Sequence, residues 1–271
     1  VLPADTGHLA FRAIPEPPAR SARRLRNAGI SQERYLELRD ALRAEAAEPR
    51  SARELRAALD VEESLTPVLR AMTHEGVLVR VGATGLRSNE LRYVAADVPH
   101  AEEDEALAWL AAEYLRAFGP VRPDDFAWWA GVGKRKAAAA LGTVQTDEIG
   151  GGLLLRAEDR AGFEAAPPPR GTVDLLPKWD PLPMGYAPDG RDRFADPSIV
   201  ARLYEDAEGG GGTSGDSRPI VLVDGAAAGT WGARAGDDAQ LHFEVDLFER
   251  PAPKLRKALD RRLAEVGELL G

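Results

Sequence analysis

The chain has 271 residues, of which 44% are hydrophobic and 29% are charged, and its 35 basic and 44 acidic side chains give a formal net charge of −9. This length is enough for about two domains with buried cores. No stretch approaches the ~20 consecutive apolar residues of a membrane helix, and no signal peptide is recognisable at the start. The absence of cysteine excludes disulfide frameworks, cysteine-based zinc fingers, iron–sulfur clusters and thiol catalysis. We therefore expect a soluble, cytoplasmic protein.

The negative net charge does not exclude a nucleic-acid partner, because phosphate binding depends on local charge. Residues 1–100 hold 15 basic and 14 acidic side chains, whereas the rest of the chain is acidic. Arginine supplies 30 of the 35 basic residues, and its planar guanidinium suits phosphates and guanine edges. A GC-rich coding sequence also favours arginine, so charge alone leaves the partner open.

The first part of the chain predicts a short strand, a linker and three helices. Residues 1–19 contain a proline-rich run at 15–18 and predict a short strand followed by a turn-forming linker. Ser51 precedes Glu54 at capping-box spacing, and Ser31 opens the similar run Ser31-Gln32-Glu33-Arg34, so both serines predict the start of a helix. Apolar residues at helical spacing predict a third helix over residues 62–74.

Two β-prone runs, residues 77–81 and 91–94, follow these helices and enclose a glycine-containing turn at 82–89. Three helices followed by two strands are typical of a winged helix, with residues 82–89 as the wing. We therefore predict a winged helix over residues 20–98, and any other small α+β unit is the alternative.

The same order of elements recurs over residues 99–166, which predict a second winged helix. The three predicted helices and two predicted strands cover residues 106–118, 122–129, 133–141, 143–149 and 153–156. Residues 167–271 then predict a β-rich C-terminal domain. A flexible loop is predicted at 208–215, followed by three strands at 219–223, 229–234 and 240–247. A final helix is predicted at 252–270. The predicted fold class is α+β, with tandem winged helices before the β-rich domain.

Three motifs in this order resemble those of the AlkZ-type (YcaQ-like) winged-helix DNA glycosylases, which excise alkylated bases and unhook DNA crosslinks. The first is YLRAFGPV at residues 114–121 with DDFAWWAG at 124–131. The second is LLPKWDP at 175–181, with Gly185-Tyr186 and Arg191-Asp192-Arg193, and the third is Val223-Asp224-Gly225 with Gly229-Thr230-Trp231. The resemblance implies that the partner is double-stranded, alkylated DNA. We expect a monomer that uses neither a cofactor nor a metal.

The resemblance also implies monofunctional glycosylase chemistry, in which a positioned water attacks the sugar C1′ atom after the base is reached or extruded. An alkylated purine is already a cationic leaving group, so orienting the water and stabilising the developing sugar charge are the main tasks.

The sequence departs from the family in two places. Members usually begin with another winged-helix unit that carries a catalytic Gln-x-Gln or Gln-x-Asp pair. We expect that unit to be missing before Val1, with His8 as a remnant of the strand that normally follows it. The one Gln-x-Asp here is Gln145-Thr146-Asp147, predicted on a strand of the second winged helix, where the pair could hold a water or form an ordinary polar face. In addition, Gly232 stands after Trp231, where the family usually has arginine.

Basic residues on the predicted recognition helices, wing and second motif are the candidate DNA contacts, and a solvated basic surface is the alternative. These residues are Arg53, Arg70, Arg80, Arg87, Arg92, Lys134, Arg135, Lys136, Arg191 and Arg193. The lysine–arginine cluster opens a helix, where cations oppose the helix dipole and therefore add no stability.

The remaining aromatic and histidine residues predict structural roles. At least one of Trp128 and Trp129 is expected in the core, as are Trp179 and Trp231. The four histidines lack the spacing of metal ligands. The competing functional class is a non-catalytic winged-helix protein, either a DNA-binding regulator or a protein-interaction module, which the acidic composition would suit.

Overall fold

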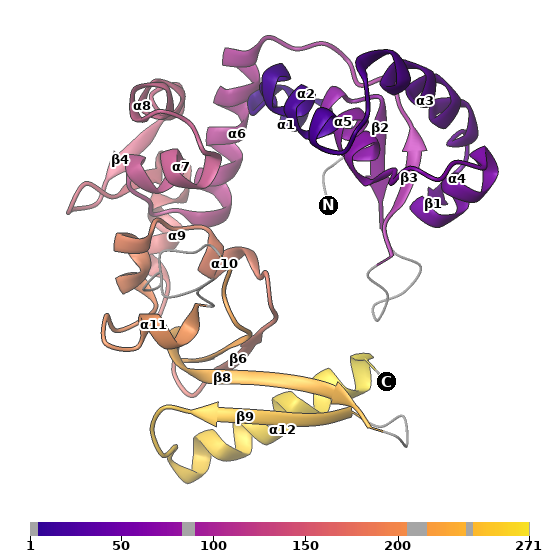
Figure 1. Cartoon of the computed structure of the whole chain (residues 1–271). Helices are drawn as coiled ribbons and strands as arrows, with labels where there is room; N and C mark the ends of the chain where they lie inside the picture. The colour runs from indigo at the N-terminus through magenta and orange to yellow at the C-terminus, as the bar shows by residue number, and fades with distance from the viewer. Residues whose placement is uncertain (1–4, 83–89, 205–215, 237–240, 271) are drawn as a thin grey trace. The chain divides into compact units, whose positions relative to one another are not determined.

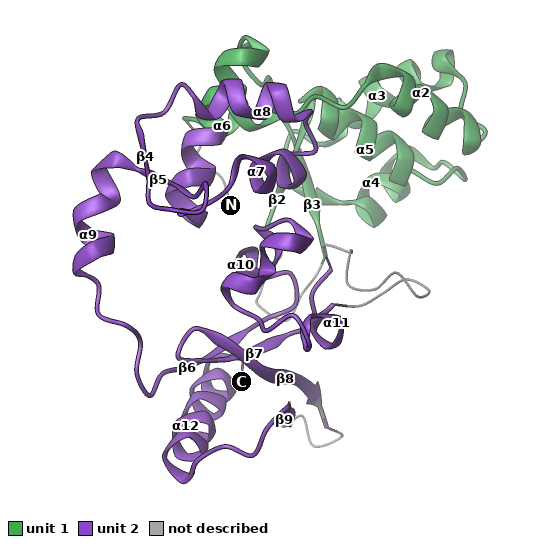
Figure 2. Cartoon of the chain, turned by 90° about the vertical axis from the view of Figure 1, so that its left-hand side faces the viewer, with its two compact units in different colours: residues 1–110 green, residues 111–271 purple. Residues whose placement is uncertain are grey.

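The computed structural model describes residues 5–82, 90–204, 216–236 and 241–270 (Figure 1). The chain divides into two compact units, residues 1–110 and residues 111–271 (Figure 2). Both contain helices and small antiparallel sheets, which confirms the α+β class. The domain boundaries predicted after residues 19, 98 and 166 stay predictions. No helix in the described part of the chain combines the length and apolar character that a membrane span requires.

Unit 1 begins with two helices, α1 (Gly7–Ala13) and α2 (Pro18–Asn27). Over the described residues 5–19 the predicted strand is therefore wrong, and His8 lies in a helix instead of a strand. Helix α2 was not predicted at all. Ala13 is the one buried residue of α1 and Leu25 the one of α2, so neither helix carries the apolar periodicity that reveals a helix in a sequence. Pro18 fits the first turn of α2, where its missing N–H has no intrahelical partner to lose.

The rest of unit 1 follows the predicted order of three helices and two strands, with one short strand added. These elements are α3 (Gln32–Glu45), β1 (Arg50–Ser51), α4 (Ala52–Leu59), α5 (Thr66–Glu75), β2 (Leu78–Val81) and β3 (Arg92–Ala95). The strands form an antiparallel sheet in the order β1-β3-β2. Of the predicted wing at 82–89, all but Gly82 lies outside the described residues.

Capping fixes the helix ends of unit 1. Ser31 Oγ accepts the Arg34 N–H at the start of α3. At the start of α4, the Ser51 N–H donates to the Glu54 carboxylate across 2.7 Å and Ser51 Oγ accepts the Glu54 N–H, so the predicted capping box is present. Gly76 ends α5 at φ +76°, a left-handed conformation that glycine adopts without strain.

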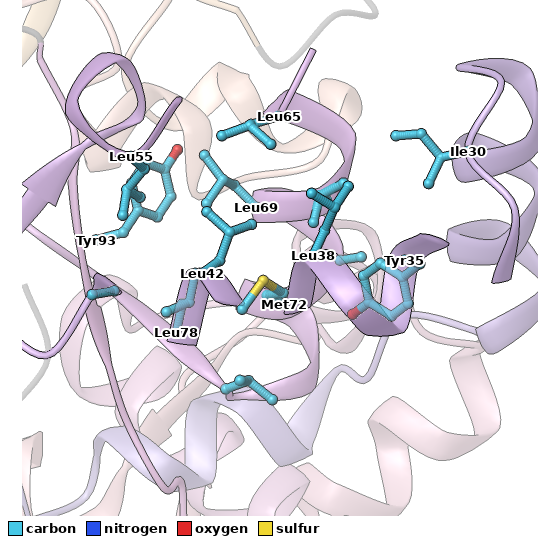
Figure 3. Packing of buried hydrophobic residues seen from close by; sticks show 14 of the residues in the cluster. Ile30, Tyr35, Leu38, Leu42, Leu55, Leu65, Leu69, Met72, Leu78 and Tyr93 are labelled. Carbon is cyan, nitrogen blue, oxygen red and sulfur yellow. The ribbon is translucent and has the colours of Figure 1, made fainter. Parts of the chain in front are cut away.

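The core of unit 1 joins α3, α4, α5 and the sheet. Leu42, Leu55 and Met72 have no exposed surface, and Leu69 and Leu78 lie in the same apolar cluster (Figure 3). All residues of this cluster come from residues 25–95. The apolar cluster of the first repeat, defined here as residues 32–95, is therefore completed by α2 and includes no described residue beyond Ala95.

The second repeat, residues 103–156, has the same order of elements. Its helices and strands are α6 (Glu103–Phe118), α7 (Pro123–Ala130), α8 (Lys134–Leu141), β4 (Thr146–Glu148) and β5 (Leu154–Arg156). Val121 lies between α6 and α7 and forms an antiparallel bridge with Leu154, while β5 also pairs with β4. The order Val121, β5, β4 thus matches the order β1-β3-β2, and one residue takes the place of a strand.

The C-terminal part of unit 2 is built on a four-stranded antiparallel sheet in the order β6-β7-β8-β9. Its elements are η1 (Ala157–Asp159), α9 (Arg160–Ala165), β6 (Val173–Leu176), α10 (Pro181–Met184), η2 (Pro188–Arg193), α11 (Val200–Leu203), β7 (Ile220–Val223), β8 (Ala226–Ala235), β9 (Leu241–Leu247) and α12 (Pro253–Leu270). Helix α12 runs along this sheet (Figure 1), and its residues Leu255, Leu259 and Leu263 belong to the apolar cluster between them. The three strands and the final helix predicted here are confirmed, while the predicted loop at 208–215 lies outside the described residues.

Candidate nucleic-acid interface

Two of the predicted DNA contacts in the first repeat are exposed on α5 and β2. Arg70 lies on the outer face of α5, and Arg80 lies on β2 opposite Tyr93. Arg70 is close enough to Glu16 to help lower the pKa of that carboxyl, although the hydrogen bond from Arg24 is the largest cause. Both guanidinium groups are therefore open to solvent, as a phosphate contact requires.

Acidic neighbours partly neutralise two further predicted contacts. Arg53 Nη2 lies 4.0 Å from Glu90 Oε1, and Arg92 Nη2 lies 3.5 Å from Glu54 Oε2. The same Glu54 caps α4, and the Ser51 backbone N–H holds the pKa of its carboxyl below the ordinary value. Arg53 remains the more accessible of the two arginines, with 87% of its side chain exposed. The predicted contact Arg87 lies outside the described residues.

Helix α2 carries an arginine stripe, defined here as Arg20, Arg23 and Arg26. These exposed residues follow one another at intervals of three, which places them along one side of the helix. None forms a side-chain hydrogen bond or ion pair with any described residue, and α2 contains no acidic residue, whereas the neighbouring Arg24 pairs with Glu16. This stripe was not predicted, because α2 has too few apolar residues to indicate a helix; the four arginines within its ten residues were the available signal.

The basic cluster at residues 134–136 forms the first turn of α8, as predicted. Lys134 and Arg135 are exposed and Lys136 is half-buried. Lys134 Nζ lies 2.8 Å from the Asp124 carboxylate in the first turn of α7. Arg135 is therefore the most open cation of the cluster.

The two arginines predicted from the second motif lie inside unit 2. Arg191 has no exposed surface, and its guanidinium lies 3.5 Å from the ring centroid of Tyr204. Burial lowers the pKa of Arg191 and raises that of Tyr204 to about 12, so the phenol is neutral and its hydroxyl donates to the Pro183 carbonyl oxygen. Arg193 Cζ lies 4.7 Å from the ring centroid of Tyr186. DNA contact by Arg191 and Arg193 stays a prediction, and their packing favours a role in positioning.

Asp125 in the first turn of α7 is the centre of this internal arrangement. Its carboxylate is fully buried and lies 2.8 Å from Arg193 Nη2 and 3.2 Å from Arg122 Nη2. It also accepts the backbone N–H groups of Arg122 and Ala187. Burial alone would raise the pKa of Asp125, but the bonds from the two arginines and the backbone outweigh it and lower the pKa. The first and second family-like motifs are thus joined by an ionised carboxylate.

The tryptophans are placed differently from one another. Trp129 lies in an aromatic cluster, 5.0 Å from Tyr114 between ring centroids, in agreement with the core role predicted for at least one of Trp128 and Trp129. Trp231 is half-buried in the C-terminal core, and its indole N–H donates to the Leu176 carbonyl oxygen. The core role predicted for Trp179 is wrong, because 63% of this residue is exposed.

The Gln-x-Asp pair lies at the start of β4. Gln145 is exposed just before the strand, and its carbonyl oxygen accepts the Ala157 N–H. Asp147 is half-buried on the strand, with its carboxylate 3.8 Å from Arg160 Nη1. A role for the pair in holding a catalytic water stays a prediction. Among the described residues, no three His, Asp or Glu side chains are grouped as metal ligands.

Comparison with known proteins identifies the class to which this fold and these motifs belong. The family model described as DNA glycosylase AlkZ-like matches residues 1–269, so the chain belongs to the AlkZ-like DNA glycosylase family. Among solved structures, the chain is similar to Streptomyces sahachiroi DNA glycosylase AlkZ, with 20% sequence identity and a TM-score of 0.68. That similarity covers 98% of this chain and 73% of the other, and at this identity it supports the fold alone. A search of curated proteins gave no match.

Proposed function

We propose that the chain binds duplex DNA through two winged helices and acts in the excision of alkylated bases. The observation that carries this proposal is the repeat of one order of elements, helix, strand, helix, helix, strand, strand, with the sheet order first–third–second. This is the order of a winged helix, in which the third helix enters a DNA groove. Helices α5 and α8 hold that position in the two repeats. Membership of the glycosylase family supports the same partner.

The exposed cations fit contact with phosphates. Arg70, Arg80 and Arg53 belong to the first repeat, Arg135 to α8, and the arginine stripe to α2. Each phosphate contact releases condensed counterions, so affinity should fall as salt rises. Such contacts position a protein on DNA without reading its sequence, which is what an enzyme that searches for rare lesions requires.

The proposed reaction is hydrolysis of the N-glycosidic bond of an alkylated purine. A water attacks C1′, and the bond from C1′ to the base nitrogen breaks with its electron pair passing to the base. The attacking water passes one proton to bulk water, which leaves a hydroxyl group on C1′. Because the alkylated base is already cationic, it leaves without prior protonation. The chain therefore has to orient the water and stabilise the positive charge on the sugar.

The alternative function is non-catalytic DNA binding, and one contact favours it. The Asp147 carboxylate is paired with Arg160, which reduces its capacity to bind and polarise a water. The two functions make the same prediction for DNA binding and opposite predictions for base release.

The deciding experiment measures free base released from duplex DNA that carries N7-methylguanine, together with affinity for the same duplex over a range of salt concentrations. Gln145→Ala and Asp147→Asn test the pair, and Glu148→Gln on the same strand is the matched control. Release that is lost with the first two variants and kept with the control assigns the chemistry to the pair. If all three variants still release the base, the chemistry lies elsewhere in the chain. Binding without base release supports non-catalytic DNA binding. Affinity that does not depend on salt would contradict the proposed phosphate contacts.

A further inference from the structure

Trp179 has a backbone conformation that does not suit a large side chain. Its φ is +65°, in the left-handed region, and the other described non-glycine residues there are Asp60 and Asp224. Aspartate tolerates this region because its short side chain can form local hydrogen bonds, whereas a bulky residue there is an outlier. Tryptophan at this position therefore needs a reason other than local backbone preference.

The turn formed by residues 177–180 requires a positive φ at Trp179. The Asp180 N–H donates to the Pro177 carbonyl oxygen across 3.1 Å, which closes a four-residue turn with Trp179 in third place. A positive φ in third place is typical of glycine or asparagine. The turn is held from its far side as well, because the Asp180 carboxylate accepts the Leu182 N–H at the start of α10. The backbone thus presents residue 179 in one fixed conformation.

Burial does not compensate for the strain. Trp179 is 63% exposed, whereas Trp231 is half-buried and packs in the C-terminal core. The indole N–H of Trp179 donates to Asp216 Oδ1 across 3.2 Å, which orients the exposed ring. A strained backbone that holds an oriented, solvent-exposed aromatic ring indicates a binding residue, because nothing in the packing of the described residues of unit 2 requires this side chain.

The chemistry beside the ring indicates the kind of ligand. Lys178 Nζ lies 5.6 Å from the ring centroid of Trp179. A flat aromatic surface next to an ammonium group matches a nucleotide, whose base stacks on the ring while its phosphate attracts the cation. We propose that Trp179 stacks on a nucleobase that becomes exposed where a duplex is damaged or opened. This inference rests on the proposed function, since it requires DNA as the partner.

The test compares two short duplexes that differ at one position. One is intact, and the other carries an abasic-site analogue opposite 2-aminopurine, whose fluorescence falls when it stacks. Trp179→Gly removes the ring and places the preferred residue in the turn, Trp179→Phe keeps an aromatic ring, and Phe163→Ala removes another exposed aromatic residue of unit 2 as the control.

We expect Trp179→Gly to weaken binding to the abasic duplex by about tenfold, the loss that follows removal of one base-stacking side chain. The same variant should abolish the 2-aminopurine quenching seen with the original chain, while binding to the intact duplex changes little. Trp179→Phe should retain most of both signals. Thermal unfolding of Trp179→Gly should match or exceed that of the original chain, because the turn is relaxed.

Three outcomes would contradict the inference. If Trp179→Gly binds and quenches as the original chain does, no base stacks on the ring. If the variant instead unfolds at lower temperature or changes the oligomeric state, the ring has a structural or self-association role. If the original chain binds neither duplex, the proposed function itself fails, and this result is distinct from normal binding that the substitution leaves unchanged.

Discussion

The Arg193 guanidinium donates to the buried carboxylate of Asp125 across 2.8 Å, and this pair joins the start of α7 to the end of η2. Arg122 completes the site from the other side and also lies 3.1 Å from Asp189. Two segments distant in the chain are thereby held in one position by charge. The arrangement is most sensitive to the loss of Asp125, because the half-buried Arg193 would then lose its carboxylate partner.

Asp125→Asn should lower the free energy of unfolding by about 3–5 kcal/mol at neutral pH, the usual loss when one member of a buried ion pair is removed. Urea denaturation followed by circular dichroism would measure the change. Asp124→Asn, in the same turn but exposed and paired with Lys134 on the surface, should change stability by less than about 1 kcal/mol. Equal effects of the two substitutions would contradict the central role of Asp125.

The same carboxylate should make stability depend on pH. The pKa of Asp125 is lower in the folded chain than the ordinary value, so the folded state binds fewer protons than the unfolded state. The stabilisation is present above the unfolded-state pKa of about 4 and is lost as pH falls through the folded-state pKa. The difference in unfolding free energy between the original chain and Asp125→Asn should therefore shrink on acidification below about pH 4. A difference that stays constant from neutral to acidic pH would argue against an ionised Asp125.

Gly190→Ala should also destabilise unit 2. A Cβ at this position would lie 2.5 Å from Asp125 Oδ1 and 2.6 Å from Arg122 Nη2. The carboxylate has no room to yield because Arg193 and the Ala187 N–H also hold it, so a loss of about 1–3 kcal/mol is expected. Gly162→Ala is the control: its Cβ would have no neighbour within 4 Å, and alanine in helix α9 should be neutral or stabilising.

Replacing the arginine stripe, Arg20, Arg23 and Arg26, by glutamine should weaken binding to duplex DNA without unfolding the chain. The slope of log affinity against log salt should become shallower by about 0.9 for each phosphate contact that is lost. The matched triple substitution of Arg34, Arg39 and Arg43 on α3 removes arginines that are already paired with acidic residues. A stripe variant whose slope equals that of the original chain would remove α2 from the interface.

The parts of the fold that the sequence predicted are those with strong local signals. Ser51 with Glu54 defined a helix start, and Asp224-Gly225 defined a hairpin, as the positive φ of both residues reflects. Helix α2 lacked such a signal because one leucine, Leu25, is its buried contact. The prolines at 15, 17 and 18 indicated a linker, and no nearby sequence signal indicated a helix instead.

The candidate site was harder to predict because its geometry depends on distant residues. From the sequence, Arg191 and Arg193 were predicted to contact DNA. In the structure, Arg191 packs against Tyr204, and Arg193 contacts Tyr186 and Asp125. Trp179 read as a core residue because large aromatic residues are usually buried. Its positive φ and exposure are properties of a turn, which composition and spacing do not reveal.

Glu54 and Asp125 are equivalent residues of the two repeats, since each is the third residue of its helix and accepts the N–H of the residue before that helix. Glu54 caps its helix at the surface, and its repeat closes a core with neighbours from residues 25–95 alone. Asp125 caps its helix in the same way but is also ion-paired with Arg193, which lies far along the chain. The two copies therefore differ in autonomy: the apolar cluster of the first lies within residues 25–95, whereas the second is tied by an ion pair to a segment about 70 residues further along the chain.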